Sequence, residues 1–495
     1  MISSLCWVPK GASKVVPVVA EPPSKEEIEE VLRTGVLERS RDSEEEDDDD
    51  MDVDDATKEE DEVIHARAAA KALNQNRRLK DSSDVHAVAD GFEELNMDAY
   101  DDEDDGLELF SSGLGDAYYP SNDMDPYLQN KDDEDEDDDE IEDMTIKPTD
   151  SVIICARNED EVNHLEVWIV EDSIDGDVNM YVHHDIILPA FPLCTAWLDC
   201  NHKSGDKGNF VAVGTMEPAI EIWDLDLIDE VEPFLVLGGV SKKKKKEKKK
   251  SVVYRKDSHR DSVLGLAWNR EVRNVLASAS ADKSVKIWDL GTGKCVATVR
   301  HHEDKVQSVA WNRQHHQLLL TGSFDKSVAL LDADSITKVS NKWQVLADVE
   351  SLAWDPHVDH SFIVSQENGT VQGFDVRTAS SDSSGGKPLF TLQAHEKAIS
   401  SISYNPSVPS YSFTGSTDKM VKLWDLSNNQ PSCVASKNLK AGSIFSIAFS
   451  EDSPFLLAAG GHKGKLKVWD MTSEPEVARK FDKYTKLRKD SATAL

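Results

Sequence analysis

Long apolar runs are missing from this 495-residue sequence. No stretch of eighteen consecutive apolar residues occurs, so we expect no membrane-spanning segment. The N-terminus also lacks the charged start and the long apolar core of a secretory signal peptide. We therefore expect a protein without membrane partners.

Cysteine is scarce as well, with six residues and no CxxC pair or disulfide-like spacing. Cys194, Cys200 and His202 have the side chains of metal ligands, but the two cysteines flank a predicted strand and no second ligand pair follows. No glycine-rich phosphate loop occurs either. We expect reduced thiols, in a cytosolic or nuclear protein, and neither a metal nor a cofactor.

Positive charge is deficient, with 55 lysine and arginine residues against 94 acidic ones and a net charge of -39. The imbalance is local, because residues 41–150 contain 42 acidic and 9 basic residues. The rest of the chain is nearly neutral. The sequence therefore describes a globular protein with one very acidic segment.

Two series of related segments recur along the rest of the chain. One resembles "VESLAW" and the other "SVKIWDL", with short apolar β-rich segments between and after them. Their aromatic or equivalent positions are Trp197, Trp268, Trp311, Trp354, Tyr404 and Phe449 in the first series, and Trp223, Trp288, Leu331, Phe374, Trp424 and Trp469 in the second. Four strands in about 40–45 residues are typical of a propeller blade, and these segments resemble the WD-repeat family from Ser151 onward.

The opening "ISSLCWVP" resembles the first strand of such a unit, with Trp7 in the place of Trp354. The segments around residues 151–188 would supply the other three strands of that blade, with Trp168 in the expected aromatic position. We therefore predict an all-β, seven-bladed WD-repeat propeller whose first blade is interrupted by a long insertion. Such an insertion is tolerable because loop-closure entropy grows only slowly with length.

The predicted divisions follow from these patterns. Residues 1–10 form the first strand of blade 1, and residues 11–150 are an acidic insertion with short helices, mostly disordered because like charges repel and bury no core. Residues 151–485 form the propeller, with a lysine-rich loop at 241–251. Residues 486–495 are a C-terminal tail.

Two interpretations of the acidic tracts remain open. They are a solvating segment, or a polyanion that binds basic partners such as histones or ribosomal proteins. Ser43, followed by "EEEDDDD", resembles an acidophilic-kinase site, where phosphorylation would increase the negative charge.

A repeated set of polar residues resembles the parts of a hydrolase. Recurrence in several blades argues against catalysis, since an enzyme needs one nucleophile in one pocket. In the WD-repeat family, the corresponding positions form buried hydrogen-bond networks within blades, and the resemblance implies that role here. The residues are His259, Ser278, Asp282 and Trp288; His302, Thr321 and Asp325; and His395, Thr414, Asp418 and Trp424.

Leu331 and Phe374 replace the third-strand tryptophan in two blades, and Lys463 stands where Asp282 and Asp418 stand in others. We expect those blades to lose part of the network while the ring still closes.

The lysine-rich loop favours a nuclear localisation signal over a contact with RNA phosphates, because no aromatic residue is interleaved for base stacking. Its lysines are Lys242, Lys243, Lys244, Lys245, Lys246, Lys248, Lys249 and Lys250.

The opening strand, the acidic insertion behind it and the tryptophans in register together closely resemble the periodic tryptophan protein family. Members of that family are nuclear and nucleolar WD-repeat proteins of ribosome biogenesis. The resemblance implies a non-catalytic scaffold in pre-rRNA processing or large-subunit assembly, monomeric within larger complexes. Its partners would be pre-ribosomal assembly factors, ribosomal proteins or histones, with RNA contacted indirectly or through phosphates.

Two other functions compete with this one. The first is a chromatin adaptor that binds histones at ribosomal genes. The second, more distant, is a substrate receptor in ubiquitin ligation, suggested by "FDVR", which ends at Arg377 and has Phe374 at the tryptophan position of the WD-x-R docking pattern.

Overall fold

The computed structural model describes residues 1–20, 144–159, 162–171, 179–201, 205–240, 254–333, 339–378, 386–453 and 455–481. Contacts divide the chain into one compact unit of Met1–Ala20 with Asp137–Leu495 and a second of Glu21–Glu136. All described residues belong to the first unit, which is considered below. The predicted disorder and short helices of the insertion, Ser43, His202, the lysine-rich run and the C-terminal tail lie outside the described residues.

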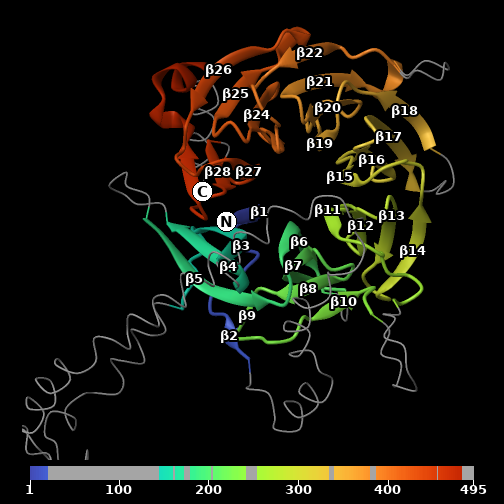
Figure 1. Ribbon diagram of the computed structural model, residues 1–495. Coiled ribbons are helices and arrows are strands. Elements are labelled where there is room, and N and C mark those ends of the chain that lie inside the picture. Colours follow the sequence, from blue (N-terminus) through green and yellow to red (C-terminus); the bar gives the residue numbers. More distant parts are fainter. Residues whose placement is uncertain are drawn as a thin grey trace, which may run out of the picture. The chain divides into compact units, whose positions relative to one another are not determined.

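Seven antiparallel sheets form a ring in this unit, with the first strand of each nearest the centre (Figure 1). The seven-bladed propeller predicted from the sequence is therefore confirmed. Blades 1 to 3 consist of β1 (Ile2–Val8), β3 (Ser151–Glu159), β4 (Val162–Glu171) and β5 (Asn179–Leu188); β6 (Pro192–Cys200), β7 (Lys207–Thr215), β8 (Ile220–Asp224) and β10 (Leu235–Leu237); and β11 (Val263–Trp268), β12 (Val275–Ser280), β13 (Val285–Asp289) and β14 (Lys294–Val299).

The remaining blades follow in chain order. Blades 4 to 6 consist of β15 (Val306–Trp311), β16 (Leu318–Ser323), β17 (Ser327–Asp332) and β18 (Val339–Gln344); β19 (Val349–Trp354), β20 (Ser361–Gln366), β21 (Thr370–Asp375) and β22 (Phe390–Gln393); and β23 (Ser401–Tyr404), β24 (Tyr411–Gly415), β25 (Val421–Asp425) and β26 (Ser432–Lys437). Blade 7 consists of β27 (Ile444–Phe449), β28 (Leu456–Gly461) and β29 (Lys467–Asp470).

The opening strand β1 is the inner strand of blade 1, as predicted. It pairs antiparallel with β3, and Trp7 lies opposite Ile153. The same strand closes the ring on blade 7, because the indole of Trp7 donates to the carbonyl of Ala448 (2.9 Å) and the N–H of Leu5 donates to Ser446 Oγ (3.2 Å). The seam between blades 4 and 5 is made by the same two bonds, from Trp354 to Ala310 (3.0 Å) and from Leu352 to Ser308 (3.2 Å). Closure between the first and last blades therefore uses the ordinary inter-blade contacts of the ring.

The core is divided among the seams between blades. Each of seven buried clusters combines residues of two neighbouring blades, including one between blades 7 and 1 that contains Ile2, Leu5 and Leu466. The strands carry apolar side chains on both faces, because both faces of each blade are covered by neighbouring blades. Burying apolar surface at every seam stabilises the ring as a whole.

Both ends of the insertion pack onto the propeller. β2 (Val18–Val19) pairs parallel with β9 (Leu227–Ile228), and the N–H of Ile146 donates to the carbonyl of Val15 (2.7 Å). Ile146 is buried between blades 1 and 2. Residues 11–20 and 144–150, assigned to the insertion from the sequence, thus belong to the propeller unit, and the separate unit spans only Glu21–Glu136.

A helical segment at 475–481 follows blade 7, although the sequence patterns predicted strands alone here. Pro475 begins it, a position where the missing N–H of proline costs nothing. Val477 and Phe481 are buried against blades 6 and 7, with the ring of Phe481 4.7 Å from that of Tyr411. The segment therefore covers one end of these two blades.

Candidate functional site

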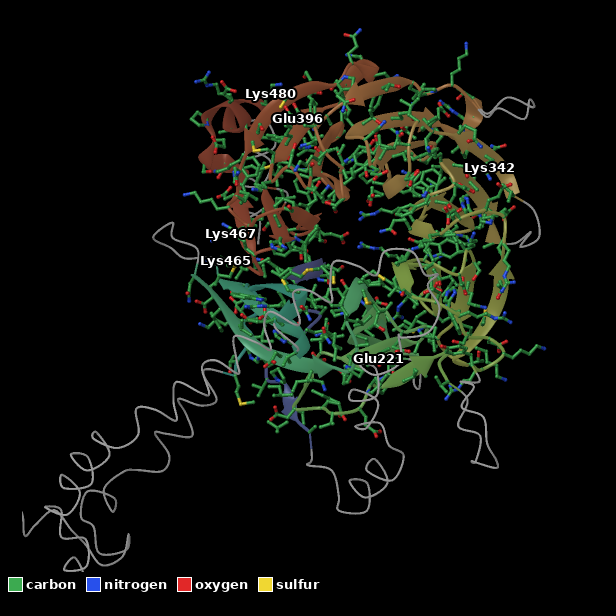
Figure 2. All side chains as sticks on the ribbon, in the orientation of Figure 1. Glu221, Lys342, Glu396, Lys465, Lys467 and Lys480 are labelled. Atoms are coloured by element: carbon green, nitrogen blue, oxygen red, sulfur yellow. The ribbon has the colours of Figure 1, made fainter. Side chains whose placement is uncertain are left out.

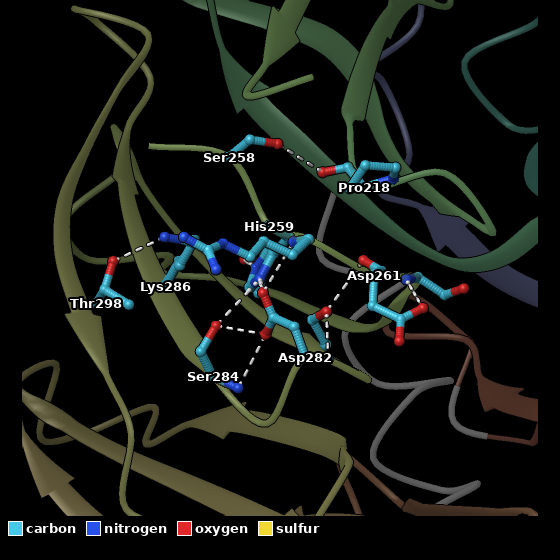
Figure 3. Close-up of polar contacts among 12 residues, drawn as sticks. Pro218, Ser258, His259, Asp261, Asp282, Ser284, Lys286 and Thr298 are labelled. Carbon is cyan, nitrogen blue, oxygen red and sulfur yellow. Dashed lines mark hydrogen bonds and ion pairs between the residues drawn. The ribbon is translucent and has the colours of Figure 1, made fainter. Parts of the chain in front are cut away.

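The residues that resembled hydrolase parts come together in three blades. In blade 3, His259 Nδ1 donates to Asp282 Oδ2 (3.0 Å), Ser278 Oγ lies 2.7 Å from His259 Nε2, and the indole of Trp288 donates to Ser278 Oγ (2.8 Å). Figure 3 shows His259 and Asp282 directed toward one another, with Ser284 donating to the same carboxylate.

The other two sets have the same arrangement. His302 joins Asp325 and Thr321, while His395 joins Asp418 and Thr414, whose hydroxyl also accepts from Trp424. All eleven residues predicted for the networks are thus brought into bonding distance.

The direction of each bond follows from the donor inventory. Trp288 and His259 Nδ1 donate, so the hydroxyl of Ser278 donates to His259 Nε2, and the histidine is neutral. Burial lowers the pKa of His259, against the opposing effect of Asp282. Burial alone would raise the pKa of Asp282, but the hydrogen bonds that its carboxylate accepts from His259, Ser284 and the N–H of Arg260 hold the pKa below its ordinary value. The network is fully paired in this state.

The hydroxyls in these networks have no access to a substrate. Ser278 and Thr321 are 0% exposed and Thr414 is 2% exposed. A nucleophile must reach a reacting atom in a pocket, whereas these groups are enclosed by neighbouring strands. The arrangement ties a turn and two strands of each blade together.

Blade 4 restores the bond that Leu331 cannot make. His301 Nε2 lies 2.8 Å from Thr321 Oγ1 and occupies the role that Trp288 and Trp424 have in blades 3 and 6. His301 Nδ1 is buried without a hydrogen-bond partner. The pKa of His301 is lowered to about 3, mainly by burial. The neighbouring His302 and Lys342 also lower this pKa, whereas Asp325 raises it. The role of His301 was not predicted from the sequence. His301 lies one residue before His302, which occupies the repeated histidine position.

We expect acid to destabilise the protein through His301. Its folded-state pKa of about 3 lies below the ordinary 6.5, so the unfolded chain binds more protons once the pH falls below about 6.5, and stability falls from there toward pH 3. For a fully buried group, the free energy of unfolding would fall by about 1.4 kcal/mol per pH unit. His301 is partly exposed, so we expect a smaller fall, of about 1 kcal/mol between pH 6.5 and 5. Urea unfolding at both pH values should show a smaller loss for His301→Gln, which can still donate to Thr321 without titrating. An equal loss in both proteins would contradict the assignment.

Blade 5 lacks the network, and none of its described residues has a buried side-chain polar atom without a partner. The positions of Ser278 and Trp288 are taken by Val364 and Phe374, which pack in the same apolar cluster. Replacing both partners of a buried bond by apolar groups avoids the cost of a lone donor. The buried Gln366 instead accepts from the N–H groups of Leu346 (2.9 Å) and Ala347 (2.8 Å).

Blade 7 loses only one partner of the bond. Trp469 keeps the tryptophan position, but its buried indole N–H has no hydrogen-bond partner. The reason is Ala459, which stands opposite Lys467 in the place where Ser278 stands opposite Lys286. In blade 7 the missing hydroxyl therefore leaves the indole N–H of Trp469 unsatisfied.

Ala459→Ser should stabilise the protein by about 1 kcal/mol, because the new hydroxyl would accept from the indole of Trp469. Urea unfolding measures the change. Ala458→Ser is the matched control, since Ala458 is equally buried but lies in the apolar cluster between blades 7 and 1; that change should destabilise. Similar effects at both positions would show that the indole gains nothing.

A charged cluster joins three blades through the turns that follow their inner strands. Arg270 of blade 3 donates two bonds to Glu451 of blade 7, one of 2.6 Å, and Arg313 of blade 4 donates to the same carboxylate (2.7 Å). Burial would raise the pKa of Glu451, but the two guanidiniums lower it. The cluster links turns far apart in the sequence and combines charge with exposed surface, which suits a protein contact. No motif marked these residues.

The structure also places the cysteines and Arg377, which were further candidates from the sequence. All six cysteines are free, and no cluster of histidine, cysteine or acidic residues suited to a metal occurs among the described residues. Arg377 of "FDVR" donates to Asp375 within its own blade (2.7 Å). Across the described ranges, no helix is long and apolar enough to cross a membrane.

Comparison with known proteins agrees with this geometry. The profile of the WD domain, G-beta repeat family matches residues 386–425 and 432–470, and that of the anaphase-promoting complex subunit 4 WD40 domain matches residues 245–314. An uncharacterized WD repeat-containing protein of Schizosaccharomyces pombe is 46% identical, over 80% of this chain and 76% of that protein.

Two further relatives carry a family name. Periodic tryptophan protein 1 of Saccharomyces cerevisiae is 31% identical, over 97% of this chain and 90% of that protein. The Periodic tryptophan protein 1 homolog of Drosophila melanogaster is 30% identical, over 70% and 73%. The chain therefore belongs to the periodic tryptophan protein 1 family of WD-repeat proteins.

Proposed function

We propose that this protein is a non-catalytic scaffold in ribosome biogenesis, acting in the nucleus and nucleolus in pre-rRNA processing or large-subunit assembly. Membership of the periodic tryptophan protein 1 family supports the process. The observation that carries the non-catalytic role is the complete burial of the hydroxyls of Ser278 and Thr321 inside blade networks. Those groups hold the strands of single blades together. The turns and edges of the ring are left for protein partners.

The partners we propose are pre-ribosomal assembly factors and ribosomal proteins. A ring closed through seven apolar seams presents turns from different blades at fixed positions, as the Arg270–Glu451–Arg313 cluster illustrates. A rigid surface loses little conformational freedom on binding, so more of the contact energy contributes to affinity. The acidic segment would add long-range attraction for basic proteins.

Affinity purification from nuclear extract tests the proposal. The full-length protein is compared with a version lacking residues 41–136, which keeps the stem at 144–150 that packs on the propeller. Pre-rRNA and assembly factors should be recovered with both versions, since we assign recognition to the propeller. Recovery of histones alone, lost with the acidic segment, would overturn the proposal and favour the chromatin function.

A further inference from the structure

Blade 7 has three strands among the described residues. Six blades have four strands, whereas β29 is the last strand of its sheet, and among the described residues nothing pairs with its outer edge. The helical segment at 475–481 packs at one end of blades 6 and 7, around Phe455 and Met471, rather than along this edge. Within the part of the chain that the structure describes, the outer edge of β29 is therefore unpaired, whereas β14 and β26 pair with the third strands of blades 3 and 6.

The backbone groups on this edge can be assigned. Met471 N–H donates to the carbonyl of Phe455 (3.0 Å), and the register places Trp469 opposite Leu457 and Lys467 opposite Ala459. Hydrogen-bonded pairs alternate along an antiparallel ladder, so Lys467 and Trp469 bond toward β28. The N–H and C=O of Val468 consequently point outward. In blade 3 the equivalent residue, Ile287, pairs with Ala297 of the fourth strand.

The charges beside the edge select its occupant. Lys465 and Lys467 are exposed at this rim of the ring (Figure 2), and Lys463 is exposed in the turn before β29. Lysines at an edge disfavour pairing with a second copy, which would bring the same charges together. An extended segment with acidic side chains would meet them favourably and gain the main-chain bonds.

We propose that the outer edge of β29 binds an extended acidic segment of a partner protein, which completes blade 7 as its fourth strand. The bonds would be made by the N–H and C=O of Val468, with Lys465 and Lys467 contacting the acidic side chains. This site is independent of the proposed role in ribosome biogenesis.

Hydrogen exchange on the full-length protein tests the site directly. The probe is a synthetic eight-residue peptide of alternating glutamate and valine, and the control is its lysine–valine counterpart. The glutamate peptide should slow exchange at least tenfold in fragments covering residues 465–471, and the lysine peptide should not. Local measurement separates this site from binding to the lysine-rich loop. Unchanged exchange at residues 465–471 would overturn the proposal.

Two variants define the contacts. Val468→Pro removes the outward N–H without touching the bonds to β28, a position where an edge strand tolerates proline; it should weaken the peptide's protection at least tenfold, while Val468→Thr should retain it. Lys465→Gln with Lys467→Gln leaves the backbone intact and should weaken binding severalfold, which keeps the test valid if the proline variant fails to fold. Equal protection in all variants would exclude strand addition at this edge.

Discussion

Deletion of residues 1–8 should prevent the ring from folding, whereas replacement of residues 21–136 by a short Gly/Ser linker should leave it intact. The deleted strand buries Ile2, Leu5, Trp7 and Val8 against blades 7, 1 and 2. At about 1.5–3 kcal/mol for each large side chain, their loss amounts to roughly 6–12 kcal/mol. That is comparable to the roughly 5–15 kcal/mol that stabilises a typical domain.

The second deletion removes far more chain at little expected cost. The N–H of Ile146 already bonds to the carbonyl of Val15, so the two stems of the insertion lie side by side in the folded propeller. The unfolding of both proteins is measured by circular dichroism, during heating and during titration with urea. The version without residues 21–136 should unfold cooperatively near the wild-type midpoint. A soluble, cooperatively unfolding protein without residues 1–8 would contradict the closure described here.

Thr414→Val should destabilise the protein by about 2–4 kcal/mol. The change keeps the size of the side chain but removes the hydroxyl, so the indole of Trp424 loses its acceptor and Nε2 of His395 loses its donor. Both groups are buried, where a polar atom without a partner costs about 1–3 kcal/mol.

Thr414→Ser provides the control, because serine performs the same role at position 278 in blade 3. It should cost less than about 1.5 kcal/mol, the usual loss for removing one buried methyl group. Urea unfolding of the two variants separates the hydroxyl from the methyl group. If both changes cost the same, packing alone would explain the effect and the network would contribute little.

The repeats predicted the ring because each blade repeats a pattern that period and spacing reveal. Trp7 could be placed in the first strand of blade 1 by analogy with Trp354, and the structure confirms that placement. The pairing of residues within the three networks could likewise be anticipated, since each set recurs at similar spacing.

Features that occur only once in the fold could not be predicted from the sequence. His301 acts through its position beside Thr321, which depends on the path of one turn. Arg270 and Glu451 lie in turns of different blades, and only the curvature of the ring brings them together. The stems of the insertion were hidden in a segment whose composition is dominated by charge. Local patterns identify elements, but contacts between unique residues require the tertiary arrangement.

The position of β1 also has a consequence for biosynthesis. Trp7 and its acceptor Ala448 are 441 residues apart. At roughly 5–20 residues per second, about 20 to 90 seconds pass between their appearances on the translating ribosome. During that time the apolar residues of the first strand have no seam with blade 7 to occupy. Nascent chains therefore need protection of their first few residues until translation of the last blade is complete.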